Sequence, residues 1–299
     1  MTKTLFVSDL DGTLLNEKAD ISDKAAEILN DLIENGLNFT FATARTAASA
    51  LKITEKLNLK LPCILMNGVS IYDTVTGRYM KNEYIKPENA LAVSEIFKRH
   101  NLHPFMYKIE RDMLYAVYSD FSNRAMKDFY AVRRDKYDKP FIKCSDLSEA
   151  ADSGTVYFTI LDSYEKLLPV KCEIEKNKGV KLAFYRDVYH KEYWFLEVFG
   201  SAASKYNAVV FLKNYGAYES ITGFGDNLND IPLFNACDRK GAGRFKNASR
   251  ILEDVLDRST DFVCVHQHDT VYEILAKLIG LLADKFDRRA VGEEADIGN

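Results

Sequence analysis

Apolar and polar positions over the first 83 residues follow a strand, helix, strand order. Thr4 to Ser8 is a short apolar run that predicts a buried strand, and apolar residues at helical spacing over 22–35 predict a helix. Gly36 stands where such a helix would stop. The order continues with a strand, a helix and a strand at 38–42, 46–57 and 62–66. This alternation is typical of a parallel α/β sheet.

The pattern changes in the middle of the chain. A hairpin is expected over 68–79, after which longer helices such as 87–100 alternate with tyrosine-rich strands such as 113–118 and 155–161. We expect residues 84–197 to form a second domain inserted into the first. Eleven of the 17 tyrosines lie there, and the sequence leaves open whether they serve strand formation or ligand stacking.

The α/β pattern returns after residue 198. The predicted elements are helices at 203–215, 230–237, 248–256 and 271–283 and strands at 220–224 and 262–265. We therefore predict an α/β fold with a Rossmann-like parallel core over 1–83 and 198–283. The charged residues 284–299 have little to bury and are expected to fray.

Composition and charge exclude several classes. The 299 residues are 47% apolar and carry a net charge of −4, so a nucleic acid or an anionic membrane is not an expected partner. No apolar run approaches the roughly 18 residues of a membrane span, and the N-terminus does not resemble a signal peptide. We expect a cytoplasmic protein with reduced thiols and no obligate protein partner. His266 and His268 are weak candidates for a zinc site.

The segment Asp9–Leu15, DLDGTLL, directly follows the first predicted strand. Ligands of parallel α/β sheets bind beyond the carboxyl ends of the strands, so Asp9 and Asp11 are expected at the functional edge. Two carboxylates there favour a hard divalent cation such as Mg²⁺. Taken alone, the segment is also compatible with an ordinary turn.

A second acidic segment follows the strand predicted at 220–224. It reads GDNLND and places Asp226, Asn229 and Asp230 at a strand end and at the start of a helix. Either aspartate could be a simple helix cap. Their coincidence with the first segment favours one shared site.

Two more positions suit a phosphate group. Thr43 ends the second predicted strand, and Lys205 lies at the start of a helix, so a hydroxyl, backbone N–H groups and an ammonium are available to phosphate oxygens. In isolation, the threonine is also explained as a turn cap and the lysine as a surface charge.

In this order, the residues resemble the haloacid dehalogenase superfamily of phosphohydrolases. DLDGTLL is similar to its first motif, Thr43 of FATART to its second, Lys205 of SKYNAV to its third and GDNLND to its fourth. The inserted domain, together with Asn67-Gly68 after the third strand, resembles the Cof-type subgroup with a large α/β cap.

The resemblance implies a role for each residue. Asp9 would be the nucleophile that forms an aspartyl phosphate, and Asp11 would be the general acid and base, which requires a raised pKa or a proton supplied by the geometry of the site. Mg²⁺ would be held by the Asp9 carboxylate, the Asp11 backbone carbonyl and Asp226. The implied contacts to phosphate or substrate are Leu10, Thr43, Ala44, Lys205 and Asn229, and the implied supporting residues are Asp230 and Arg45.

Three positions depart from the family pattern. Ala44 replaces a common glycine, and we expect activity to survive this change. Tyr206 follows Lys205 where glycine is common, and we expect it to narrow the entrance. The basic segment 238–247 is expected to be a solvated face, although it also suits an anion contact.

The resulting hypothesis is a Mg²⁺-dependent phosphatase acting on a small phosphorylated metabolite, with sugar phosphates favoured. A phosphosugar mutase would use the same nucleophile, and a non-enzymatic switch would use phosphorylation of Asp9 as a signal. Asp11 disfavours the switch because a general base shortens the life of an acyl phosphate. A degenerate scaffold is disfavoured because every expected catalytic residue is present. Neither the specific substrate nor the oligomeric state follows from the sequence.

Overall fold

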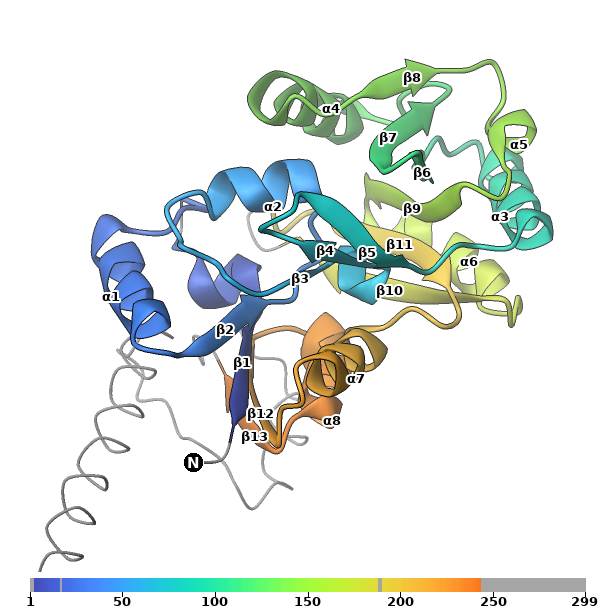
Figure 1. Cartoon of the computed structure of the whole chain (residues 1–299). Coiled ribbons are helices and arrows are strands. Elements are labelled where there is room, and N and C mark those ends of the chain that lie inside the picture. The colour runs from blue at the N-terminus through green and yellow to red at the C-terminus, as the bar shows by residue number, and fades with distance from the viewer. Residues whose placement is uncertain (1–2, 17, 188–189, 243–299) are drawn as a thin grey trace, which may run out of the picture.

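The computed structural model describes residues 3–16, 18–187 and 190–242, which form a parallel core sheet and a larger cap sheet (Figure 1). Several predictions lie outside these residues, namely the helices at 248–256 and 271–283, the strand at 262–265, the tail 284–299 and the pair His266 and His268.

The core sheet has the order β13-β12-β1-β2 and is parallel throughout. Its central strand β1 (Thr4–Ser8) lies between β12 (Ser220–Gly225) and β2 (Asn38–Phe41), and β13 (Arg239–Ala242) forms the edge. Ser8 pairs with Phe224. The residues that follow β1 and β12 therefore emerge side by side, which confirms the predicted parallel core and brings the two acidic segments together.

Four helices accompany this sheet: α1 (Asp23–Glu34), α2 (Ala47–Ile53), α7 (Lys205–Tyr215) and α8 (Ile231–Ala236). The Ser22 hydroxyl caps α1 by accepting a hydrogen bond of 3.2 Å from the Ala25 N–H. The helix predicted over 46–57 is shorter and ends at Ile53. Thr54 follows as its C-cap, and its hydroxyl donates to the Ala50 carbonyl at 2.9 Å.

A small antiparallel sheet forms the exit from the core. It consists of β3 (Cys63–Leu65), β4 (Ser70–Asp73) and β5 (Arg78–Asn82), which confirms the predicted hairpin. Strand β3 is shorter than the predicted 62–66. A single parallel bridge between Ala42 and Ile64 connects it to the core.

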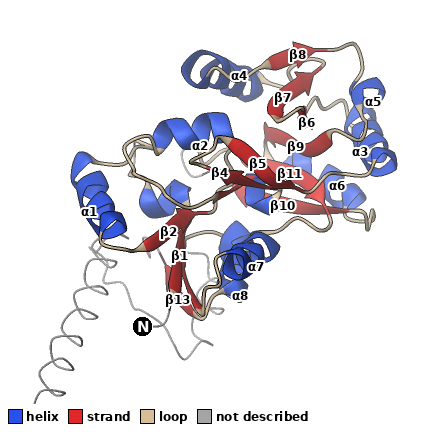
Figure 2. Cartoon of the chain, in the orientation of Figure 1, coloured by secondary structure: helices blue, strands red, loops and turns tan. Residues whose placement is uncertain are grey.

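The cap is a six-stranded sheet of order β10-β11-β9-β6-β7-β8, mostly antiparallel, with helices packed on it (Figure 2). Its central strand β9 is buried at every residue. Strand β11 continues to Gly200, three residues beyond the predicted boundary at 197. The elements of the cap are α3 (Pro87–Arg99), β6 (Phe105–Glu110), β7 (Met113–Tyr118), α4 (Arg124–Tyr137), β8 (Phe141–Lys143), α5 (Leu147–Ala150), β9 (Thr155–Asp162), α6 (Tyr164–Ile174), β10 (Val180–Arg186) and β11 (Trp194–Gly200).

The cap meets the core at several places. Helix α4 contacts α2, and β10 contacts the short helix Leu228–Asp230 that follows β12. These contacts lie beyond the carboxyl ends of β1 and β12. The cap therefore covers the edge of the sheet where the acidic segments lie.

Two expectations from composition concern the chain as a whole. Cys63, Cys144, Cys172 and Cys237 are free thiols, as expected, and Cys264 lies outside the described residues. None of the described helices has the length and apolar character needed to cross a membrane.

Candidate active site

Asp9 is the first residue after β1, and only 4% of it is exposed. Its N–H donates to the Phe224 carbonyl at 2.8 Å, which continues the ladder between β1 and β12. Its carboxylate accepts a hydrogen bond of 2.6 Å from the Lys205 ammonium. The end of the central strand thus presents a carboxylate in a fixed, nearly dry position.

Lys205 begins α7 and joins two carboxylates. Its fully buried ammonium donates to Asp9 and to Asp230, each at 2.6 Å. Burial alone lowers the pKa of this ammonium, but the Asp230 and Asp9 carboxylates raise it above the ordinary value. Lys205 therefore carries a charge, as expected of a residue that holds phosphoryl oxygens.

Gly68 allows α7 to start at this place. Its φ is +93°, and a Cβ there would lie 2.2 Å from the Ser204 carbonyl group. Only glycine fits both this backbone conformation and this approach. The Asn67-Gly68 turn therefore fixes the start of the helix that carries Lys205.

Asp226, directly after β12, is also buried, and its carboxylate packs over Gly12. A Cβ on Gly12, whose φ is +82°, would lie 2.1 Å from Asp226 Oδ2. The Thr13 hydroxyl donates to Asp226 Oδ1 at 3.4 Å. The glycine of DLDGTLL is thus needed so that the carboxylates of the two acidic segments can meet.

Asp230 supports both Asp226 and Lys205. One carboxylate oxygen accepts from Lys205, and the other accepts from the N–H groups of Asp226 and Asn227 at 3.0 and 3.1 Å. These are the contacts expected of the supporting role implied by the resemblance.

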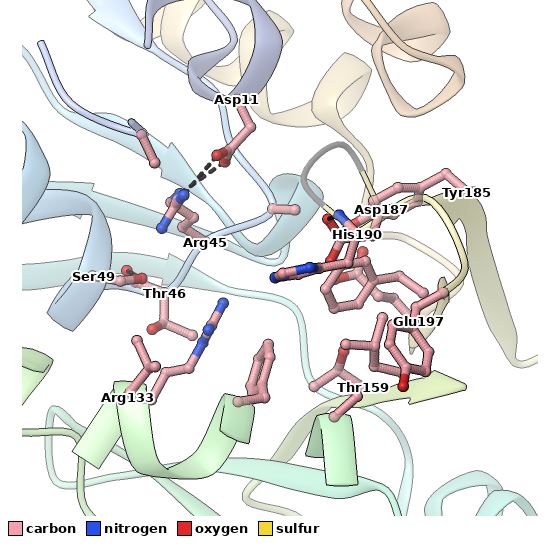
Figure 3. A pocket seen from close by; sticks show the side chains of 18 of the residues that line it. Asp11, Arg45, Thr46, Ser49, Arg133, Thr159, Tyr185, Asp187, His190 and Glu197 are labelled. Carbon is pink, nitrogen blue, oxygen red and sulfur yellow. Dashed lines mark hydrogen bonds and ion pairs between the residues drawn. The ribbon is translucent and has the colours of Figure 1, made fainter. Parts of the chain in front are cut away.

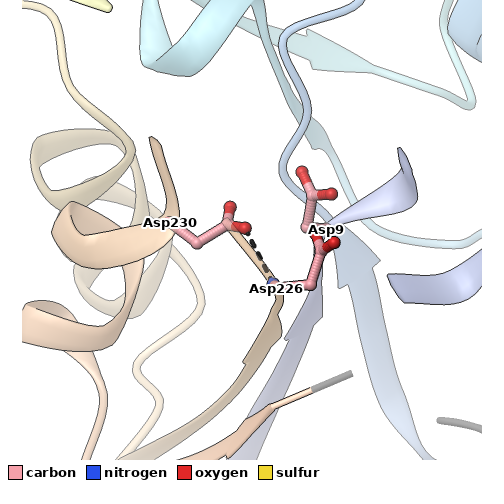
Figure 4. Close-up of side chains that lie close together, drawn as sticks. All are labelled: Asp9, Asp226 and Asp230. Atoms are coloured by element: carbon pink, nitrogen blue, oxygen red, sulfur yellow. Dashed lines mark hydrogen bonds between the residues drawn. The ribbon is translucent and has the colours of Figure 1, made fainter. Parts of the chain in front are cut away.

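Oxygens of Asp9, Asp226 and Asp230 lie within 4.8 Å of one another (Figure 4). Burial and then the Asp230 charge raise the pKa of Asp9 to about 8 and that of Asp226 to about 9. Three buried carboxylates share one ammonium, which leaves an excess of negative charge. The donor set and its charge fit a hard divalent cation such as Mg²⁺.

The side chain of Asp11 points away from this cluster, toward Arg45 (Figure 3). The guanidinium donates to both carboxylate oxygens, at 2.7 and 2.6 Å. The Asp11 side chain is therefore not part of the carboxylate cluster, and its backbone carbonyl is the atom the resemblance assigns to the metal.

A cavity of about 550 Å³ opens from this site between core and cap. Of the ten residues singled out from the sequence, five line it: Asp9, Asp11, Ala44, Arg45 and Asn229. The others, Leu10, Thr43, Lys205, Asp226 and Asp230, are buried around it. Thr43 accepts a hydrogen bond of 3.1 Å from the Arg45 N–H through its hydroxyl.

One expectation about the entrance is not supported. Tyr206 is 43% exposed and is not among the residues that line the cavity. It therefore does not narrow the entrance in this structure. The reason is its position on the first turn of α7, next to Lys205 but directed to solvent.

The sequence did not point to a second buried network, centred on Glu197 in β11. The Asn67 amide, from a backbone with φ +57°, donates to Glu197 at 2.7 Å and to the Tyr157 hydroxyl at 3.1 Å. Asn229 in turn donates to Asn67 at 3.3 Å. The network connects the cap to the fourth motif, and the signal for it was an isolated acid within the apolar strand WFLEVF.

Burial dominates the electrostatics of this network. It raises the pKa of Glu197 from 4.5 to about 7, against the lowering effect of hydrogen bonds from Tyr157, Tyr185 and Asn67. Glu197 and both tyrosines line the cavity. Some of the tyrosines concentrated in the cap therefore surround the cavity, while others, such as Tyr118, pack against aromatic neighbours.

Comparison with known proteins shows the family of the chain. The profile of the family described as haloacid dehalogenase-like hydrolase matches residues 6–274. A mannosyl-3-phosphoglycerate phosphatase of Pyrococcus furiosus is 26% identical over 273 residues, covering 86% of this chain and all of that protein. A pyridoxal phosphate phosphatase of Escherichia coli is 23% identical over 240 residues, covering 79% and 86%.

The fold agrees as well. A crystal structure of a Thermotoga maritima protein superposes with a TM-score of 0.69 at 26% identity, covering 93% of this chain and 97% of that one. With the motif residues gathered at one sheet edge beneath an α/β cap, the chain belongs to the haloacid dehalogenase-like hydrolases and is a Cof-type phosphoric monoester hydrolase.

Proposed function

We propose that the protein is a Mg²⁺-dependent phosphatase that hydrolyses a small phosphorylated metabolite, with sugar phosphates as the favoured class. The observation that carries the proposal is the Asp9 carboxylate, held by Lys205 beside Asp226 and opening into a cavity beneath the cap. Two relatives named as phosphatases of phosphorylated metabolites support the same class.

In the first step, an oxygen of Asp9 attacks phosphorus and forms an aspartyl phosphate, while the bond from phosphorus to the leaving oxygen breaks. Asp11 gives its proton to that oxygen, so a neutral alcohol leaves. Lys205 holds Asp9 in place and offers positive charge to the phosphoryl group. Thr43, Ala44, Leu10 and Asn229 are the proposed contacts to the other phosphoryl oxygens.

In the second step, Asp11 takes a proton from water, whose oxygen attacks phosphorus. The bond to Asp9 breaks, inorganic phosphate leaves, and both carboxyl groups return to their starting states. Mg²⁺, held by Asp9, Asp226 and the Asp11 backbone carbonyl, would supply charge that offsets the phosphoryl oxygens. In the structure Arg45 donates to both oxygens of Asp11 and so fixes the direction of the proposed acid and base.

The cap limits what can reach Asp9. Helix α4 of the cap contacts α2 of the core, and the cavity lined by Asp9 lies between cap and core, which disfavours a phosphate carried by a folded protein. Small molecules are therefore the proposed partners, with a cytoplasmic location and no nucleic acid, membrane or obligate protein partner.

The test is phosphate release from a panel of phosphorylated metabolites, with Mg²⁺ and with EDTA. We expect turnover that requires Mg²⁺ and yields free phosphate. A mutase would instead return a phosphosugar isomer, which product analysis detects. If neither the panel nor p-nitrophenyl phosphate released phosphate, the proposal would be wrong and the phosphorylation switch would take its place.

A further inference from the structure

Two cations of the cap face the cavity without an acidic partner. Arg133 lies in the last part of α4, and Lys139 follows that helix. Both line the same cavity as Asp9. Among the residues that the structure describes, neither has a carboxylate within the 4.0 Å of an ion pair, although Lys139 is only 4% exposed.

The backbone brings these two side chains together at the end of the helix. Asp138, with φ +48°, caps α4 in the left-handed conformation and reverses the chain. The Lys139 N–H then donates to the Arg133 carbonyl at 3.1 Å. Lys139 is thereby directed into the cap and not away from it.

Aromatic rings hold both cations in place. The Arg133 guanidinium carbon lies 3.4 Å from the centre of the Phe129 ring. The Lys139 ammonium lies 4.5 Å from the centre of the Tyr107 ring and donates to the Tyr107 hydroxyl at 3.4 Å. Cation–π contacts fix position but leave the charge without a counter-ion.

Within the described part of the chain, Arg133 and Lys139 lie near other positive charge and form no ion pair with a carboxylate. Burial, then Arg133, then Arg45, lower the pKa of Lys139 well below its ordinary value. Burial also lowers the pKa of Arg133 to about 10. A buried cation is normally paired, so an anion from outside the chain would relieve the repulsion among the three.

The acids that line the cavity do not supply this anion. Asp9 is paired with Lys205. Both oxygens of Asp11 accept from Arg45, so the Asp11 charge offsets only part of the burial effect on the pKa of Arg133. Glu197 is bound by Asn67, Asp187 accepts from the His190 N–H, and Asp128 pairs with Arg124 at 3.6 Å on the exposed face of α4. Glu192 is exposed. Figure 3 shows Arg133 pointing from α4 toward Arg45 and Asp11, across the space a substrate would fill.

We propose that Arg133 and Lys139 bind a second anionic group of the substrate, a carboxylate or a second phosphate, while the reacting phosphoryl group lies at Asp9. This inference rests on the proposed phosphatase function and narrows its substrate class. The favoured substrates are phosphorylated sugar acids and bisphosphates, and neutral sugar phosphates are poorer substrates. The cavity of about 550 Å³ has room for more than a phosphoryl group.

Matched substrate pairs test the proposal. Glucose 6-phosphate against 6-phosphogluconate, and glycerol 3-phosphate against 3-phosphoglycerate, test an added carboxylate. Fructose 6-phosphate against fructose 1,6-bisphosphate tests an added phosphate. In either the carboxylate pairs or the bisphosphate pair, we expect kcat/KM to be at least about tenfold higher for the doubly anionic member. The gain should come mainly from a lower KM, because charge-assisted hydrogen bonds are strong where water is excluded.

Two substitutions locate the effect. Lys139→Met and Arg133→Gln, which keep much of the side-chain volume, should each lower the preference ratio about tenfold. The control Lys136→Met removes an exposed cation of the same helix that does not line the cavity, and should leave the ratio unchanged. Thermal unfolding shows whether each variant is folded. If Lys139→Met does not fold, the preference ratio of Arg133→Gln is the deciding result.

The outcomes separate this inference from the proposed function. Equal kcat/KM within every pair, with clear phosphate release, would overturn the second-anion site and leave the phosphatase standing. A preference for the doubly anionic substrate that is unchanged in both Lys139→Met and Arg133→Gln would also overturn the second-anion site and leave the phosphatase standing. Absence of phosphate release from every ester, p-nitrophenyl phosphate included, would overturn the phosphatase itself.

Discussion

Arg45 donates one hydrogen bond to each carboxylate oxygen of Asp11, at 2.7 and 2.6 Å. The planar guanidinium fixes the direction of the carboxylate by binding both of its oxygens. Arg45 is itself placed by its backbone N–H, which donates to Thr43. The second motif therefore positions the proposed acid and base of the first.

Replacing Arg45 tests this positioning role. Arg45→Gln should lower kcat/KM for alkyl phosphates about 10²-fold, because a poor leaving group needs a well-placed general acid. Aryl phosphates, whose leaving groups need little protonation, should lose much less. The measurement is the ratio of the two kcat/KM values. An equal loss on both would show that Arg45 acts on binding and does not position Asp11.

Gly12 is predicted to be essential for the metal site. In Gly12→Ala, the new Cβ would meet the Asp226 carboxylate in addition to straining a φ of +82°. Gly36→Ala is the matched control, because Gly36 has a φ of +94° and no atom within 4 Å of the added Cβ. Gly36→Ala should lose about 1–2 kcal/mol of stability from the strained φ alone, and Gly12→Ala should lose at least as much because of the added contact with Asp226. Only Gly12→Ala should also need much more Mg²⁺ for half-maximal activity, and equal Mg²⁺ requirements would contradict the prediction.

Mg²⁺ should stabilise the folded protein because it offsets the excess charge of Asp9, Asp226 and Asp230. At about 100 times its dissociation constant, an ion that binds only the folded state adds about 2.7 kcal/mol. Thermal unfolding with Mg²⁺ and with EDTA measures the difference. Asp226→Asn should abolish the Mg²⁺-dependent part, whereas a retained shift would place the ion elsewhere.

Glu197 is predicted to make stability fall as pH rises. Its folded pKa of about 7 lies above its ordinary value of 4.5, so between these values the folded state binds more protons than the unfolded state. Stability from this group is present below about pH 4.5 and is lost by pH 7, with an upper limit of about 3 kcal/mol. Glu197→Gln should remove this loss.

The comparison is the thermal midpoint of wild type and Glu197→Gln from pH 5 to pH 8. The thermal midpoint of Glu197→Gln should rise relative to that of the wild type as the pH increases. Parallel curves would show that Glu197 does not titrate in this range.

The sequence was most informative where polar residues directly follow predicted strands. The existence of strands β1, β2 and β12 and the shared site of the two acidic segments follow from apolar periodicity and from the rule that parallel strands present ligands at their carboxyl ends. Asp9, Lys205 and Asp226 could therefore be assigned to one site before their contacts were known.

The cap residues could not be predicted in this way. Arg133 and Lys139 belong to the highly charged stretch VRRDKYDK, in which the sequence does not show which cation faces inward. That choice depends on the left-handed turn at Asp138 and on the rings of Phe129 and Tyr107. The Asn67 contacts were hidden as well, because Glu197 lies within an apolar strand of the cap and no pattern in the sequence places that strand beside Asn67.

The central claim is that Asp9 is the nucleophile, and an Asp11→Asn variant tests it most directly. With p-nitrophenyl phosphate, which needs no acid to leave, the first step should proceed while the second is slowed. We predict a burst of nitrophenolate stoichiometric with enzyme. Borohydride reduction of the quenched protein should then yield homoserine at position 9, found by mass spectrometry, and Asp9→Asn should show neither. Turnover that persists in Asp9→Asn, or a burst with an unmodified Asp9, would contradict the account.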